Sequence, residues 1–188
     1  AVLQKAGDFV AVARPTYEAA GYEVQTARLA TVPYPRIMPS LKTEDVITLA
    51  QELERKANAL GFGYISLGPA LPDFPESYPI IPQVLAVTKS TFLSGVIASP
   101  ETGISLPAIR ACADIICQTA TLDPNGFGNL FFAALANVPA DAPFFPAAFH
   151  DRDEPAFALA LEAADLSVSS VAAANSLDEA RCNLVTTV

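Results

Sequence analysis

Short apolar runs alternate with amphipathic helical patterns along this chain, and this alternation limits the fold more than any other feature. The runs at residues 63–68 (GYISLG), 91–98 (TFLSGVIA) and 130–136 (LFFAALA) are apolar on both faces, which is typical of strands buried within a parallel sheet. Units of about 30 residues link them, and such spacing favours parallel strands joined by helical crossovers. We therefore predict an α/β fold with largely parallel strands.

The clearest predicted helix covers Thr43–Leu60, where Val46, Leu49 and Leu53 begin one apolar stripe. Glu44 lies in its first turn, where the helix dipole favours negative charge. Ser105 is predicted to cap a second helix, and Ser176 with Glu179 forms a capping box for the last one. Further helices are predicted at residues 2–20, where Pro15 should kink or split the helix, 79–89, 106–119 and 165–174, and further strands at residues 22–30 and 156–161.

The composition narrows the class of protein and its partners. The chain is 52% hydrophobic and 16% charged, as expected for one α/β domain over residues 1–188 whose sheet is covered by helices. Its net charge of -9 and scattered basic residues exclude a nucleic-acid partner, because phosphates would be repelled. The uncharged runs are shorter than the roughly 20 residues of a membrane helix, so we expect no membrane partner.

The three cysteines, Cys112, Cys117 and Cys182, are an odd number and contain no CxxC spacing. This pattern indicates reduced thiols in a cytoplasmic protein, packed as small buried hydrophobes. Cys112 and Cys117 would diverge on their helix, so a metal shared between them is not expected.

The stretch Asn125–Pro155 contains most of the candidate functional residues. Asn137 stands at the carboxyl end of the predicted strand 130–136, where parallel sheets bind ligands. Asn129 precedes that strand, and both amides are candidate ligand contacts; the alternative is an amide that satisfies loop backbone. Arg28 and Arg36 flank the end of the predicted strand 22–30 and could clamp an anion, or could simply be solvated.

The only histidine, His150, begins a cluster with Asp151, Asp153 and Glu154. Three interpretations compete. The cluster could hold a divalent metal through oxygens and one nitrogen; His150 could be a general acid or base oriented by a carboxylate such as Glu154; or the segment is a solvated acidic loop. No GxSxG motif supplies a nucleophile for His150.

Four stretches resemble one known family. They are GDFVAVARPTYEAAGYEVQTARLAT, GYISLGPA, GFGNLFFAALANVP and FFPAAFH followed by DEPAFALALEAADL. Their order resembles the N-terminal half of the uncharacterised group known as domain of unknown function 711, whose members are often labelled "PFL family protein".

The resemblance implies a β/α barrel related to that of pyruvate formate-lyase, or the N-terminal half of one, lacking the first strand and the C-terminal half. It does not imply glycyl-radical chemistry, so no radical cofactor is expected. A half barrel would expose two sheet edges. We therefore expect self-association into a homo-oligomer, or a complementing chain segment.

Two hypotheses on function follow. In the first, Asn129, Asn137, His150, Asp151 and Glu154 converge at the barrel mouth to bind a small polar or anionic metabolite, with Arg28 or Arg36 meeting its charge and with His150 and Glu154 as candidate catalytic groups. In the second, the protein is a non-catalytic binding or assembly protein, and the same loop makes a subunit contact.

Overall fold

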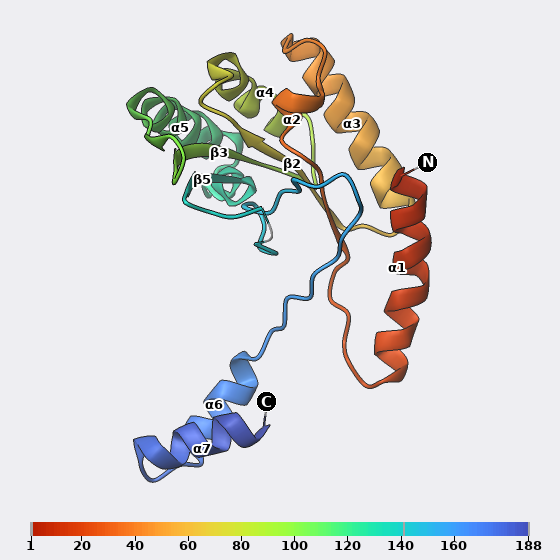
Figure 1. Ribbon diagram of the computed structural model, residues 1–188, viewed down its shortest axis with the longest axis vertical. Helices are drawn as coiled ribbons and strands as arrows, with labels where there is room; N and C mark the ends of the chain where they lie inside the picture. Colours follow the sequence, from red (N-terminus) through yellow and green to blue (C-terminus); the bar gives the residue numbers. More distant parts are fainter. Residues whose placement is uncertain (1, 141, 188) are drawn as a thin grey trace. The chain divides into compact units, whose positions relative to one another are not determined.

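The strands form one mixed sheet in the computed structural model, which describes residues 2–140 and 142–187. Within these residues the sheet has five strands: β1, β2, β3 and β5 run parallel in that order, and the short β4 pairs antiparallel with the end of β3. Figure 1 shows β2, β3 and β5 with α4 above them. The strands are β1 Arg28–Ala30, β2 Tyr64–Ala70, β3 Thr91–Ser99, β4 Gly103–Ile104 and β5 Phe132–Ala136.

Helices precede, connect and follow the strands, so the predicted α/β alternation is confirmed. Ser105 caps α5 as predicted, because its Oγ accepts a hydrogen bond of 3.3 Å from the backbone N–H of Ala108. The α-helices are α1 Val2–Ala19, α2 Tyr34–Ile37, α3 Thr43–Ala59, α4 Ile81–Leu85, α5 Leu106–Thr119, α6 Ala164–Ala172 and α7 Leu177–Thr187, and the 3-10 helices are η1 Pro75–Ile80, η2 Ala120–Leu122 and η3 Phe127–Phe131.

Several predicted elements differ from the observed ones. The predicted strand 22–30 is a strand only at β1, because β2 offers partners only from Tyr64 to Ser66. The predicted strand 156–161 is wrong: these residues form no strand and are exposed, since alternation alone does not supply a neighbouring strand. Helix α1 continues through Pro15 rather than splitting there.

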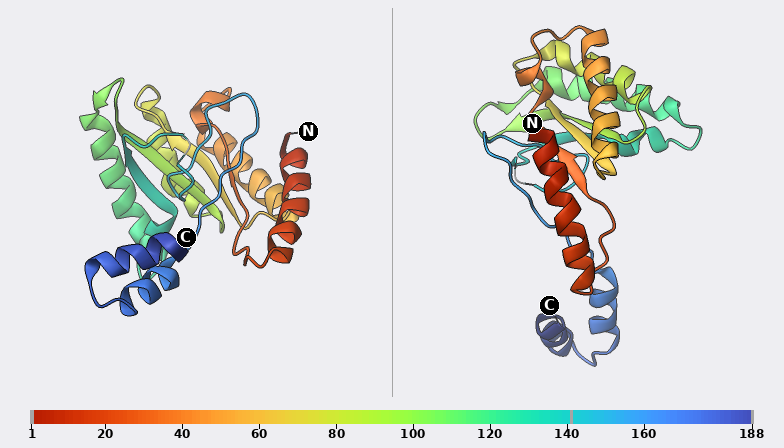
Figure 2. Two further views of the ribbon diagram at one scale, coloured as in Figure 1. Left: turned by 60° about the horizontal axis from the view of Figure 1, so that its bottom comes forward. Right: turned by 90° about the vertical axis from the view of Figure 1, so that its right-hand side faces the viewer.

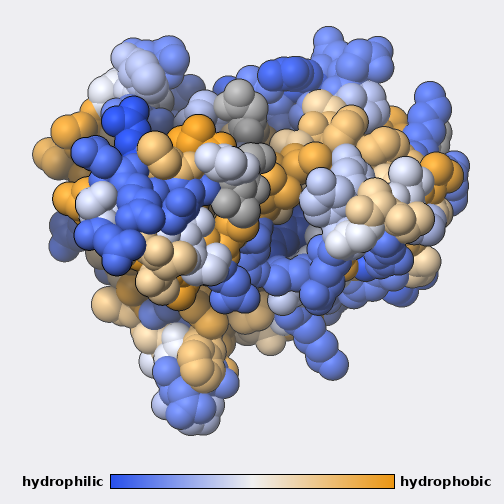
Figure 3. All heavy atoms as spheres, turned by 90° about the horizontal axis from the view of Figure 1, so that it is seen from below, coloured by the Kyte–Doolittle hydropathy of each residue, from blue (hydrophilic) through white to orange (hydrophobic). Residues whose placement is uncertain are grey.

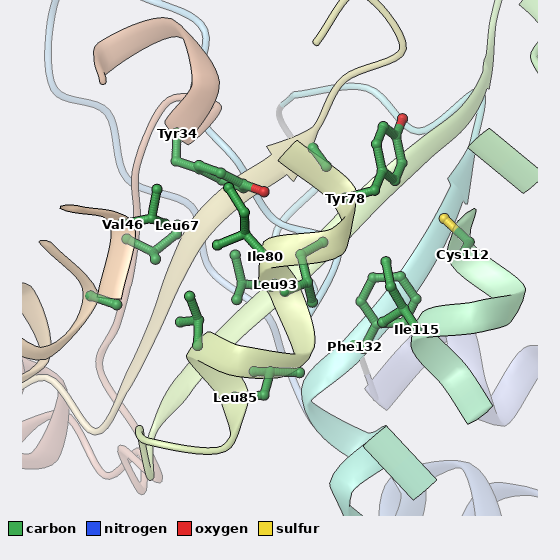
Figure 4. Close-up of a cluster of buried hydrophobic side chains, with 14 of the residues drawn as sticks. Tyr34, Val46, Leu67, Tyr78, Ile80, Leu85, Leu93, Cys112, Ile115 and Phe132 are labelled. Atoms are coloured by element: carbon green, nitrogen blue, oxygen red, sulfur yellow. The ribbon is translucent and has the colours of Figure 1, made fainter. Parts of the chain in front are cut away.

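The main core lies between the sheet and helices α3, α4 and α5. Val46 from α3, Leu67 from β2 and Leu93 from β3 are fully buried within it, and Figure 4 shows these side chains between the two layers. Tyr34 enters the same core and its hydroxyl donates a 2.5 Å hydrogen bond to the Ser77 carbonyl. This layer leaves the opposite face of the sheet free of α3, α4 and α5 (Figure 2).

Glu54 joins α3 to the start of β3. Its Oε1 accepts hydrogen bonds from the backbone N–H groups of Lys89 and Ser90, at 2.9 and 2.6 Å, and from the Thr91 hydroxyl at 3.1 Å. Partial burial by itself raises the pKa of the Glu54 carboxyl, but the hydrogen bonds from Ser90, Lys89 and Thr91 outweigh burial and hold the pKa below its ordinary value.

A Glu54→Gln variant is expected to lose stability in a pH-dependent way. The carboxylate stabilises the fold fully above its unfolded pKa of about 4.3, and this contribution disappears as the pH falls through the lower folded value. At pH 7 the variant should lose about 1 kcal/mol of unfolding free energy, and the difference should shrink toward zero below about pH 4. Urea unfolding at several pH values measures this; a constant difference from pH 7 to pH 3 would contradict it.

The chain divides into two compact units, one up to Ala158 and one from Leu159 onward. The first contains the sheet, and the second contains α6 and α7, in which the Asn183 amide donates to the Ser170 carbonyl at 3.3 Å. Across residues 2–140 and 142–187, no helix has the length and hydropathy needed to span a bilayer.

The sheet is open within the described residues, with β1 and β5 at its edges. The predicted largely parallel α/β fold is confirmed by this topology, whereas closure into a barrel is not observed. The parallel order nevertheless brings the carboxyl ends of β1, β2, β3 and β5 to one edge of the sheet.

Candidate functional site

The two faces of the sheet differ in what covers them. Leu93 packs in the helix-side core, and a Cβ on Gly95 would lie 2.9 Å from the Cys112 Sγ of α5. Because side chains alternate along a strand, Phe92 and Ser94 point to the opposite face. Residues 142–150, here called the strap, lie on that opposite face, here called the strap face.

Three contacts hold the strap in place. The Ser66 hydroxyl donates a 2.7 Å hydrogen bond to the Ala148 carbonyl, and the backbone N–H of His150 donates one of 2.9 Å to the Thr31 carbonyl. The Phe145 ring packs edge-on against Phe92, with centroids 5.5 Å apart. Figure 2 shows this light-blue segment passing over the sheet.

The strap places His150 at the carboxyl end of β1. Thr31, its backbone partner, directly follows β1, and the Thr31 N–H in turn donates to the Ser66 carbonyl at 2.9 Å. The His150 side chain is half-buried. This hydrogen bond uses the backbone N–H of His150, so the imidazole does not take part in the tether.

The two candidate asparagines do not converge. Asn137 follows β5 at its carboxyl end, where its N–H donates to the Ala98 carbonyl at 3.0 Å and its φ is 54°. Asn129 lies in η3, before β5, and its Oδ1 accepts a hydrogen bond from the Thr119 hydroxyl. The expected meeting of Asn129 with His150 is therefore wrong, because a whole strand separates Asn129 from the carboxyl edge.

The candidate arginines are also separated. Arg28 is the first residue of β1, and its guanidinium carbon lies 5.4 Å from the Tyr64 ring centroid and 5.7 Å from that of Phe145. Arg36 lies on α2, beyond the carboxyl end of β1, and is exposed. The two therefore lie at opposite ends of β1 and do not form one anion clamp.

The acidic residues after His150 face solvent. Asp151 and Glu154 are exposed, and the Asp151 Oδ1 lies 3.8 Å from the Arg152 Nε. In the described parts of the chain no group of three or more His, Cys, Asp or Glu side chains is arranged to hold a metal ion. Of the three interpretations of the cluster, this geometry favours a solvated loop that begins at a tethered histidine.

The cysteines are free, and one lies in the core. Cys112 is buried on α5, and this burial raises the pKa of its thiol to about 11, which keeps it protonated at neutral pH. Cys117 and Cys182 are exposed, so the predicted burial holds for Cys112 alone, and Cys112 and Cys117 diverge as predicted.

Two serines on the strap face were missed by the sequence analysis. Ser66 and Ser94 are both fully buried, and the Ser94 hydroxyl has no hydrogen-bond partner among residues 2–140 and 142–187. The available signal was a serine within each apolar strand run, GYISLG and TFLSGVIA. Such a serine is also common in ordinary strands, so only the structure distinguishes these two.

Comparison with known proteins identifies relatives over most of the chain. The family described as "Uncharacterised ACR (DUF711)" matches residues 1–187. A UPF0210 protein of Methanococcoides burtonii is 33% identical over 143 residues, covering 72% of this chain and 32% of the relative. UPF0210 proteins of Syntrophotalea carbinolica and Halothermothrix orenii are 31% and 32% identical, each covering 82% of this chain and 36% of the relative.

The chain thus spans about a third of the length of these curated relatives. The family match covers both compact units, and it is the family that the sequence resembles. This chain belongs to the uncharacterised family DUF711.

Proposed function

We propose that this protein binds a small polar or anionic metabolite on the strap face, at the carboxyl ends of its parallel strands. The observation that carries the proposal is the tether between the His150 N–H and the Thr31 carbonyl. It holds the chain's only histidine at the edge of the sheet where α/β proteins bind ligands. A half-buried imidazole there can donate or accept a hydrogen bond, and its charge changes near neutral pH.

This sheet is one part of a proposed β/α barrel. Helices on one face of a parallel sheet are the arrangement of one sector of such a barrel. In a barrel the strap face would be the interior, and the carboxyl edge would be the mouth. Since the chain spans about a third of its relatives, the remaining strands would come from elsewhere.

Within this site His150 is the candidate general acid or base. Asn137, at the carboxyl end of β5, is a candidate ligand contact, and Arg36, beyond β1, is the candidate partner for an anionic group. Asp151 and Glu154 follow His150 closely enough to orient its ring once a ligand excludes water.

A His150→Ala variant tests the site. The backbone tether survives this change, so the melting temperature should stay within about 2 °C of the wild type. We expect the thermal shifts that wild-type protein shows with a panel of short mono- and dicarboxylates, hydroxy acids and inorganic phosphate to be lost. Phe157→Ala, a truncation at an exposed ring, is the matched control and should keep them. Identical shifts in His150→Ala and wild type would reject the proposal.

A second candidate function is assembly without catalysis. It is favoured by large apolar side chains that reach the surface; Figure 3 shows such orange groups beside polar ones. Phe127, Leu130 and Phe144 are each more than half exposed. If assembly is the function, His150→Ala should change the mass measured by light scattering and leave every thermal shift unaltered.

A further inference from the structure

We infer that the strap is a movable cover over a hydrogen-bonding subsite formed by Ser94 and Ser66 in the middle of the strap face. The inference deepens the proposed function and rests on it for the identity of the occupant. It assigns a role to two serines that the His150 hypothesis does not use. The subsite would take a small molecule with a hydroxyl or carboxylate oxygen next to an apolar side.

The first step is the state of the Ser94 hydroxyl. Ser94 is 0% exposed, yet its Oγ has no hydrogen-bond partner in the described part of the chain. A buried hydroxyl without a partner destabilises the folded protein, and buried polar groups are normally paired. An unpaired group on an otherwise well-satisfied sheet therefore marks a position where another molecule can supply the partner.

The second step is the surroundings of that hydroxyl. Ser66 lies on the neighbouring strand and on the same face, because it pairs with Phe92 in the register and its own hydroxyl reaches the strap. Val96 of β3 pairs with Leu135 of β5, and Leu135 is buried. Alternation places Leu135 and Phe92 on the face of Ser94. The subsite thus combines two hydroxyls with apolar walls, which defines the ligand class stated above.

The third step is access. The strap contacts the sheet through side chains and single backbone bonds, and it is not a strand of the sheet. Phe145, half-buried between Arg28 and Phe92, is its main side-chain anchor. Opening the strap breaks these few contacts while the helix-side core stays intact. Because the strap lies outside the hydrogen-bonded ladder of the sheet, we expect it to open locally, without global unfolding.

Two serine variants test the unpaired hydroxyl without any ligand. Ser94→Ala should raise the melting temperature by about 2–4 °C, because it removes a buried group that lacks a partner among the residues that the structure describes. Ser66→Ala should lower it by a similar amount, because the Ser66 hydroxyl donates to Ala148 and accepts from the Gly68 N–H. Both serines are fully buried on one face, so each is the control of the other. If Ser94→Ala destabilises as much as Ser66→Ala, the inference fails.

A cysteine at position 94 tests the movable cover. In a Ser94→Cys protein that also carries Cys117→Ser and Cys182→Ser, alkylation by iodoacetamide is followed at position 94 and at Cys112. Cys112 is buried on the sheet-facing side of α5 and is the internal reference for the helix-side core. Labelling at position 94 should be independent of low urea concentrations, whereas labelling of Cys112 should rise steeply as global unfolding is favoured.

Loosening the anchor should act on one of the two sites only. Adding Phe145→Ala to that protein should speed labelling at position 94 about tenfold, the effect of losing one aromatic contact, without changing the urea dependence at Cys112. Equal urea dependence at both sites would overturn the inference. If the urea dependence is equal at both sites but His150→Ala loses its thermal shifts, the cover is rejected and the proposed function stands. If the urea dependence differs but His150→Ala keeps its thermal shifts, the proposed function is rejected and the cover stands.

Discussion

A Gly68→Ala variant should lose about 3 kcal/mol or more of unfolding free energy, measured by urea denaturation. Gly68 has a φ of +71°, where side chains other than glycine are strained. A Cβ there would also lie 2.8 Å from the Val32 carbonyl oxygen and 2.8 Å from the Pro33 Cα. Both atoms are backbone, so they can move only by displacing the loop after β1, which contains the Thr31 partner of His150.

Gly103→Ala is the matched control for this prediction. Gly103 has a similar φ of +69°, but a Cβ there would meet nothing within 4 Å. Its cost should be the conformational one alone, about 1 kcal/mol. Equal losses in the two variants would show that β2 does not pack closely against the loop after β1, and the position assigned to His150 would then be wrong as well.

A Leu93→Ala variant should lose about 3–4 kcal/mol, because it deletes a fully buried side chain on a central strand and leaves a cavity between two layers. Leu93 lies on β3, which has β2 on one side and β5 on the other, so little of that space can collapse. The measurement is again the unfolding free energy in urea. The strap face should be unaffected, since Leu93 points to the helix side.

Leu130→Ala removes the same atoms from a side chain that is 63% exposed. Its cost should stay within about 0.5 kcal/mol. If Leu130→Ala proves as costly as Leu93→Ala, then Leu130 is buried in solution by another chain or by a second copy. That outcome would favour the assembly hypothesis over the assignment of β5 as a free edge.

Local patterns predicted the regular elements well where one segment contains the whole signal. The apolar stripe of α3 and the Ser105 cap of α5 depend on neighbours three or four residues apart, so the helix bounds follow closely from the sequence. The strand β3 was likewise predicted from its continuous apolar run. The run at 156–161 resembled a strand equally well, but a strand also needs a partner, which lies far away in sequence.

The candidate site was predicted only in part, because a site depends on which strand end each residue occupies. His150 and Asn137 do lie at the carboxyl edge of the sheet, and for Asn137 the position of the predicted strand 130–136 indicated this. Asn129 does precede β5, as predicted, but it therefore lies at the opposite end of that strand from the carboxyl edge, and Arg28 and Arg36 lie at opposite ends of β1. Ser94 has no distinguishing neighbour in the sequence; its unpaired hydroxyl exists only because distant segments bury it.

The sequence by itself determined the alternation of helices and parallel strands, because apolar periodicity and capping act over a few residues. Only the tertiary structure decided that the strap crosses the face opposite α3, α4 and α5, that its backbone ties His150 to Thr31, and that Ser94 is buried. These facts depend on contacts between residues as far apart as Ser66 and Ala148. No local pattern encodes such contacts, because they arise from the packing of the whole sheet.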